Sequence, residues 1–241
     1  SGNLYFLGEL RPPGSEGFKT YFAVVGFFKT PLPALALLAL ATALLFRRRG
    51  RPWSTDERTL LASLPIFVPY FSLIFRAQIG LRHFLVVYPA AFVLAGIAGP
   101  WLARARWRTA CAALAVLLSA ASVTGHGPDP LSYFNEAIAP TSTWRIAADS
   151  NLDWGQSKAQ VEGWIAAHPD VLVAPAKPFP GRVLVGANVL TGVVMRKRLD
   201  WLRDAGLEPL DQIAHTHFLF DIPRETADRL RRERGDPPLD H

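Results

Sequence analysis

The sequence has one cysteine, one methionine and charged side chains at only 19% of its 241 positions. Because Cys111 is the only cysteine, no disulfide can form within the chain, and cysteine usage says nothing about the redox compartment. A Walker loop, a G-x-S-x-G sequence and an H-E-x-x-H sequence are all missing, which excludes these signatures of nucleotide binding, serine hydrolysis and zinc proteolysis. From Ser1 onward there is also no signal-peptide pattern.

Charge is distributed unevenly along the chain. Residues 1–124 hold 13 Lys and Arg against four Asp and Glu, whereas residues 125–241 hold 13 against 16. The net charge of +6 therefore comes wholly from the first, more apolar half. This pattern is typical of a membrane protein with cationic loops, and it argues against nucleic acid as a partner.

Four uncharged apolar runs lie in that first half, at 30–46, 59–75, 84–103 and 109–124. As helices they would be about 24–30 Å long, enough for the hydrocarbon core of a bilayer. A buried core helix is the alternative for the two shorter runs. Four runs in succession, separated by arginine-rich turns, favour four transmembrane helices over residues 30–124.

The turns between the runs predict the orientation. The turns 47–58 and 104–108 carry five and three arginines, against two in 76–83. Positive charge is enriched in cytoplasmic loops, so the first two turns are expected inside. We therefore expect a multi-pass protein of the plasma (inner) membrane, with residues 125–241 forming an extracytoplasmic domain.

Several cations are then expected at the outer ends of the spans, where the charge rule would not put them: Lys29, Arg76, Arg82 and His83. They could extend to lipid headgroups. Alternatively they bind a lipid-linked phosphate, since arginine pairs bidentately with phosphate and lysine adds a point charge. Residues 1–29 are rich in aromatics and are expected to lie at the membrane interface, where Glu9 is a weak candidate for a catalytic role.

Residues 125–241 alternate strand-like and helical patterns, which predicts a small α/β domain. Strands are expected at 145–149, 171–176, 182–188 and 215–222, and helices at 154–168, 195–206 and 224–235. His215 and His217 would share one face of the last strand, but the sequence shows no third ligand for a metal. No metal site is predicted, and the need for a divalent metal is left open.

The stretch ADSNLDWGQ, residues 148–156, allows three interpretations. Asp149, Asn151 and Asp153 match the first ligands of a calcium loop, but the loop then lacks its glycine and its final glutamate. Asp153 with Gln156 fits a capping box at the start of a helix. Together with Trp154, the polar residues could also face a sugar or acceptor, as could Asn135 and Glu136 in YFNEA.

Several ordered motifs resemble one family. They are YFLGE (5–9), YFAVVGFFKTPLP (21–33), IGLRHFLVVYP (79–89), YFNEA (133–137), DSNLDWGQ (149–156) and WLRDAGLEP…FLFDI (201–222). In this order they resemble the C-terminal part of bacterial membrane glycosyltransferases of family 39, relatives of the protein O-mannosyltransferases with the GT-C fold.

The resemblance implies transfer of a sugar from a polyprenyl-phosphate carrier to a protein, glycan or lipid acceptor outside the membrane. It also implies that the catalytic carboxylates lie upstream of Ser1, so this chain would be a fragment supplying the phosphate-binding cations and the outer domain. The alternative is a non-catalytic membrane anchor whose α/β domain binds a partner in the cell envelope.

The predicted topology can be tested by cysteine labelling. In a Cys111→Ala background, a cysteine introduced at Asp170 should react with a membrane-impermeant reagent added to intact cells. Labelling that requires permeabilisation of the cells would contradict the orientation.

Overall fold

The computed structural model describes residues 3–47, 54–127, 129–195 and 199–238. The chain divides into two compact units. The α/β unit comprises residues 1–15, 131–133 and 138–241, and the helical unit comprises residues 16–130 and 134–137. The segment expected as one piece over 1–29 is therefore shared between the two units. Most of the arginine-rich turn 47–58, residues 48–53, lies outside the described residues.

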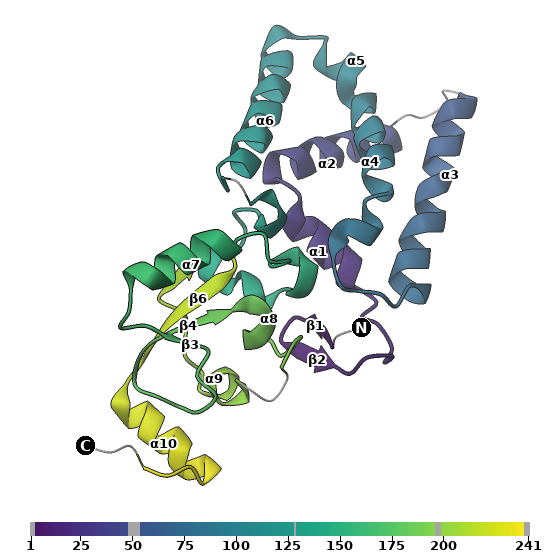
Figure 1. Cartoon of the computed structure of the whole chain (residues 1–241). Helices are drawn as coiled ribbons and strands as arrows, with labels where there is room; N and C mark the ends of the chain where they lie inside the picture. The colour runs from purple at the N-terminus through teal and green to yellow at the C-terminus, as the bar shows by residue number, and fades with distance from the viewer. Residues whose placement is uncertain (1–2, 48–53, 128, 196–198, 239–241) are drawn as a thin grey trace. The chain divides into compact units, whose positions relative to one another are not determined.

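All four apolar runs are helical (Figure 1). The helical unit contains α1 (Tyr21–Lys29), α2 (Leu32–Phe46), α3 (Thr55–Pro69), α4 (Val87–Ala95), α5 (Gly99–Leu102) and α6 (Arg106–Thr124). A π-helical turn, Tyr70–Ile74, extends α3, and 3-10 helices at Leu81–Phe84 and Gly96–Ala98 flank α4. Helix α2 contacts both α4 and α6, and α3 contacts α4.

Length and hydropathy separate these helices. Among the described residues, Arg106–Thr124 is the one single helix long and apolar enough to cross a membrane, and none of its residues is buried. Helices α1 and α2 pass the same test only as a pair bent by 117°. The apolar stretches Ala62–Ile74 and Val87–Leu102 are shorter. Four transmembrane helices thus remain a prediction.

The α/β unit is built on a four-stranded sheet of order β3-β4-β6-β5, in which β3 (Leu172–Val173) pairs parallel with β4 (Gly181–Gly186). Strand β6 (His217–Ile222) pairs antiparallel with both β4 and β5 (Asp211–Ile213). Residues 183–185 and 218–220 are buried on both sheet faces, which explains why the two central strands are continuous apolar runs.

Helices cover this sheet. Helix α7 (Lys158–Ala167) packs on one face, where Val161 and Val171 meet Leu184 and Leu219 (Figure 1). On the other face, Trp144 contacts Phe218 edge-on at 6.4 Å. The remaining helices are α8 (Ala187–Leu190), α9 (Asp200–Asp204) and α10 (Arg224–Arg234), and short 3-10 helices lie at Pro130–Ser132, Pro140–Arg145 and Asp149–Asn151.

The sequence-based boundaries were partly wrong. The strand expected at 145–149 is mostly helical turns, with a single bridge from Ala147 to Phe6. The expected strand 171–176 shrinks to two residues, and the expected helix 195–206 to Asp200–Asp204, with 196–198 outside the described residues. In contrast, the strand at 215–222 and the helix at 224–235 are confirmed to within two residues.

The first residues form a hairpin that the sequence analysis did not predict. Strands β1 (Leu4–Phe6) and β2 (Glu9–Arg11) are joined by Leu7 and Gly8, which have φ of 49° and 83°. Two positive φ values match the twist of a two-residue hairpin turn, and Gly8 adopts one without strain. Leu4, Tyr5 and Phe6 are buried. The rings of Tyr5 and Phe6 therefore belong to the core of the α/β unit.

This assignment predicts the effect of truncating Phe6, which is 3% exposed. Phe6→Ala should lower the free energy of unfolding of the α/β unit by about 3–5 kcal/mol, because a buried ring is lost and a cavity remains. Leu7→Ala, at a side chain that is 53% exposed, is the matched control and should change it by no more than about 0.5 kcal/mol. Urea unfolding followed by tryptophan fluorescence measures both. A loss of stability for Phe6→Ala as small as that for Leu7→Ala would show that the hairpin is not part of the core.

Candidate functional site

The connection between the π-helical turn and α4, residues 75–84, carries three of the predicted phosphate-binding residues. Its position is fixed by Gln78, whose side chain is 3% exposed. The Gln78 Oε1 accepts a hydrogen bond from the Phe18 N–H at 2.6 Å, and Nε2 donates to the Phe18 carbonyl at 2.8 Å. A Cβ on Gly17 would lie 2.9 Å from the Gln78 amide, so a larger residue there would force the amide to shift from this position.

Arg76 lies beside a small cavity of about 150 Å³ within the helical unit. Lys19, Ser72 and Gln78 also line it, together with the carboxylate of Glu16. Two cations against one carboxylate leave a net positive charge, and the volume suits a single small anionic group. The sequence analysis missed Lys19 and Gln78, because their positions become significant only when residues 16–19 lie against the 75–84 connection.

Arg82 and His83 lie together in the 3-10 helix before α4. The Arg82 Nε donates to the His83 Nε2 at 3.4 Å, and the His83 ring lies 5.1 Å from that of Phe75. Burial, aided by the neighbouring Arg82 charge, lowers the pKa of His83 below its ordinary value. At neutral pH the imidazole is therefore neutral, accepts from Arg82, and helps to orient that guanidinium.

Lys29 is positioned by a different segment. Its ammonium lies 4.3 Å from the centre of the Phe134 ring, a cation–π contact at the C-terminal end of α1. The next residue, Asn135, is fully buried and its amide donates to the carbonyls of Phe27 and Thr30 at 2.7 and 2.8 Å. Desolvation holds the pKa of Lys29 well below its usual range, so an anion bound beside it would favour its charged form.

The two residues of YFNEA that were predicted to face a sugar have different environments. Asn135 completes the end of α1, where four carbonyls of a helix need partners, and its buried amide is turned to the backbone. Glu136 is exposed, and its carboxylate accepts a hydrogen bond from the hydroxyl of Ser122 in α6. Of the two, Glu136 is the one whose position suits contact with an acceptor.

In the α/β unit, the stretch 149–156 forms an irregular turn held from a distance by Asn188. The Asn188 Oδ1 accepts from the Asp149 N–H at 2.7 Å, while its Nδ2 donates to the Asp153 carbonyl at 2.9 Å. Asp149 has φ of 59°, an uncommon value for a residue with a side chain. Asn188 is the second residue of α8, two positions after strand β4 ends, and the sequence analysis did not single it out.

The capping box predicted for Asp153 and Gln156 was wrong. Helix α7 begins at Lys158, after Ser157, and neither side chain caps it. Instead, the Asp153 Oδ1 accepts from the Gly155 N–H at 2.8 Å, and the Gln156 Oε1 accepts from the Trp154 N–H at 2.7 Å. The two side chains stabilise the turn before the helix, where local bonds of this kind compete with helix formation.

The polar side chains of this turn are mostly directed to its own backbone. The Asp149 Oδ1 accepts from the Ser150 N–H at 2.7 Å, and the Asn151 Nδ2 donates to the Ala148 carbonyl at 3.1 Å. Asn151 is 1% exposed, whereas the Trp154 ring is 57% exposed. Trp154 thus offers a ring for stacking, while Asn151 is buried within the turn.

Two further predicted positions can now be placed. Glu9 lies on the hairpin strand β2, exposed, with its Oε1 2.7 Å from the Nε of Arg11. His215 and His217 do not share a strand face, because β6 begins at His217 and His215 lies in a turn with φ of 57°. Among the described residues, no three His, Cys, Asp or Glu side chains group together as a metal site would require.

Comparison with protein-family models, with curated protein sequences and with solved structures finds no match. The resemblance to family 39 glycosyltransferases therefore rests on the motifs of the sequence.

The half-buried His217, at the start of β6, predicts a pH dependence. Burial lowers the pKa of His217 below the ordinary 6.5, and the nearby Asp153 carboxylate acts in the opposite direction. As the pH falls below about 6.5, the unfolded chain takes up a proton that the folded unit does not, so the free energy of unfolding decreases down to the folded-state pKa. Above pH 6.5 this contribution is fully present.

His217→Gln should remove this part of the pH dependence. Urea unfolding of both proteins between pH 5.5 and 7.5 measures it, with the difference between the proteins evaluated relative to pH 7.5. An equally steep loss of stability in the variant would contradict the assignment.

Proposed function

We propose that this protein is a membrane glycosyltransferase that transfers a sugar from a polyprenyl-phosphate carrier to an acceptor outside the cytoplasm. The observation that carries the proposal is the 75–84 connection of the helical unit. Arg76, Arg82 and His83 all lie within these ten residues, between two apolar helices. The buried Gln78 amide holds the connection in place through its two hydrogen bonds to Phe18.

The exposed apolar helices support a membrane location. Helix α6 is about 28 Å long, at 1.5 Å per residue for 19 residues. Leu114, Val116 and Leu117 are 54–66% exposed, and no residue of the helix is buried. A core helix of a water-soluble protein would be mostly buried, and so large an exposed apolar surface in water would favour aggregation. Lipid is the environment that suits this surface.

The charges of the connection suit the leaving group of the proposed reaction. When the bond between the sugar's anomeric carbon and the phosphate oxygen breaks, negative charge develops on the lipid phosphate. Arg76 and Lys19 beside the 150 Å³ cavity, and Arg82 held by His83, would stabilise that charge. The hydrogen bonds between Gln78 and Phe18 hold the backbone near Lys19 and Arg76 in place before the substrate binds, and such pre-organisation is the source of electrostatic stabilisation.

The other half of the reaction needs a base. The new bond forms between the anomeric carbon and an acceptor hydroxyl, whose proton passes to a carboxylate. Glu9 is exposed and paired with Arg11 within the hairpin. In line with the resemblance to family 39, we propose a carboxylate outside this chain as the base. Glu136 and the exposed ring of Trp154 are proposed as acceptor-facing groups, each within its own unit.

The proposal predicts a large effect of Arg82. In membranes containing the complete protein, Arg82→Ala should reduce transfer of radiolabelled sugar from its polyprenyl phosphate by about 100-fold or more, the scale of losing one transition-state donor. Arg82→Lys should recover only part of the rate, because a point charge does not replace the bidentate fork.

Arg104→Ala is the matched control, since it removes an exposed arginine from the turn between α5 and α6. At equal expression it should leave transfer unchanged. Equal rates for the Arg82 and Arg104 variants would assign Arg82 to the lipid headgroups. The absence of transfer in every protein, with carriers of several sugars, would favour a non-catalytic membrane anchor.

A further inference from the structure

The cavity beside Arg76 has one feature that phosphate binding does not by itself explain, the carboxylate of Glu16. The cavity measures about 150 Å³, and its other charged lining residues are Lys19 and Arg76. All of the lining residues belong to the helical unit. A carboxylate repels an anion, so its presence in a cationic cavity calls for a separate physical reason.

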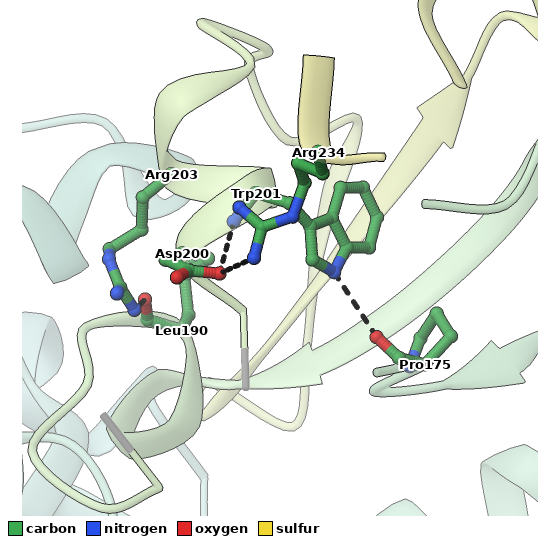
Figure 2. Close-up of polar contacts among 6 residues, drawn as sticks. All are labelled: Pro175, Leu190, Asp200, Trp201, Arg203 and Arg234. Atoms are coloured by element: carbon green, nitrogen blue, oxygen red, sulfur yellow. Dashed lines mark hydrogen bonds and ion pairs between the residues drawn. The ribbon is translucent and has the colours of Figure 1, made fainter. Parts of the chain in front are cut away.

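The two cations of the cavity are available to a ligand. Lys19 and Arg76 are exposed, and neither side chain has a hydrogen-bond or ion-pair partner among the described residues. In the α/β unit, by comparison, the Arg234 Nη2 donates to the Asp200 carboxylate at 2.8 Å (Figure 2). That guanidinium stabilises the fold, whereas the N–H donors of Lys19 and Arg76 can bind an anion.

Ser72 adds a neutral donor to the cavity. It lies in the π-helical turn Tyr70–Ile74 and is one of the lining residues. In α2 and α6, the hydroxyls of Thr42 and Ser119 donate to the carbonyl four residues earlier. The Ser72 hydroxyl has neither this bond nor another hydrogen-bond partner among the described residues. It can therefore donate to a phosphate oxygen.

The charges of the lining match an anion of charge −1. Lys19 and Arg76 contribute two positive charges and Glu16 contributes one negative charge, so the lining carries a net charge of +1. A phosphodiester, such as a glycosyl polyprenyl phosphate, carries one negative charge at neutral pH. A phosphate monoester carries about two, because its second pKa lies near about 6.

The proposed transfer reaction converts the first kind of anion into the second. The bond between the anomeric carbon and the phosphate oxygen breaks, the acceptor oxygen bonds to the anomeric carbon, and the acceptor proton passes to the base. The polyprenyl phosphate keeps the electron pair of the broken bond and gains one negative charge. Glu16 therefore repels the product more strongly than it repels the donor.

We propose that Glu16 makes this cavity charge-selective: its carboxylate weakens the binding of the dianionic polyprenyl phosphate and thereby promotes release of the product. Lys19, Arg76 and Ser72 bind the phosphate group of donor and product alike. Without Glu16, a lining of charge +2 would hold the product more tightly, and the product would inhibit the next turnover. This role rests on the proposed transfer reaction, because that reaction produces the dianion.

Glu16 also opposes the charge that develops during bond cleavage, so its effect on the product is measured by equilibrium binding. Isothermal titration calorimetry on the complete protein in a nonionic detergent at pH 8 compares farnesyl phosphate, a dianion, with farnesyl methyl phosphate, a monoanion. Glu16→Gln should lower the Kd of the dianion by about threefold or more relative to the Kd of the monoanion. A few-fold effect is expected because Glu16 is exposed and solvent screens its charge.

Glu162→Gln is the matched control, since it removes an exposed carboxylate of α7 in the α/β unit. It should leave the Kd of both probes unchanged. An equal change of both Kd values in Glu16→Gln, or no change, would overturn the role of Glu16 and leave the transferase activity to be decided by the Arg82 variants. Failure of the unmodified protein to bind either probe would overturn the phosphate site itself.

The neutral donor gives a second readout. Ser72→Ala should raise the Kd of both probes by the same factor, about twofold or more, because a neutral hydroxyl does not distinguish the two charges. The melting temperature of the ligand-free protein should stay unchanged, since this hydroxyl bonds no described residue. Unchanged affinity for both probes would remove Ser72 from the site.

The selectivity should also appear during turnover. Polyprenyl phosphate added to the transfer assay should inhibit Glu16→Gln at a concentration about threefold or more below that for the unmodified protein, relative to the KM for the donor. Ordinary phospholipids are phosphodiesters as well. Equal inhibition of the two proteins would assign the cavity to phospholipid headgroups and would overturn its role in product release.

Discussion

Two hydrogen bonds between the Gln78 side-chain amide and the backbone of Phe18 hold the 75–84 connection of the helical unit in place. This connection carries Arg76 and Arg82. The two bonds join segments 60 residues apart and satisfy a backbone N–H and a carbonyl that precede α1. Gly17 permits the approach, since any Cβ there would collide with the amide. The two bonds thus hold the connection that carries Arg76 and Arg82 against the residues before α1.

Side-chain amides perform the same task elsewhere in the molecule. Asn135 donates to two carbonyls at the end of α1, and Asn188 binds both Asp149 and Asp153 across the turn before α7. An amide both donates and accepts, so one side chain can satisfy two backbone groups of an irregular segment. In each case, a side-chain amide holds the backbone of a segment that carries exposed or charged side chains.

Backbone groups satisfied by side-chain amides also explain why non-helical segments are tolerated beside the apolar helices. In the membrane location that we propose, no water reaches unpaired N–H and carbonyl groups, so irregular segments at the membrane edge would need partners from the protein. The helical unit provides them through Gln78 and Asn135. In the α/β unit the opposite situation occurs at Trp144, where the buried indole N–H has no hydrogen-bond partner among the described residues.

The sequence by itself determined the elements whose cause is local. The four apolar runs became helices, and β6 and α10 lie where periodicity placed them, because composition and repeat act over a few neighbouring residues. It also grouped Arg82 with His83, which are adjacent in the chain. The N-terminal hairpin was missed, since β1 depends on contact with Ala147 far along the sequence.

Only the tertiary structure decided which polar residues serve the fold and which remain for function. Asp153 and Gln156 read locally as a helix cap, but Asn188, 35 residues beyond Asp153, holds the turn and delays the helix until Lys158. Asn135 resembled a ligand-facing residue, yet its amide is used by α1. The hydrogen bonds between Gln78 and Phe18 could not be predicted from the sequence, because bonds between distant segments leave no periodic pattern in either segment.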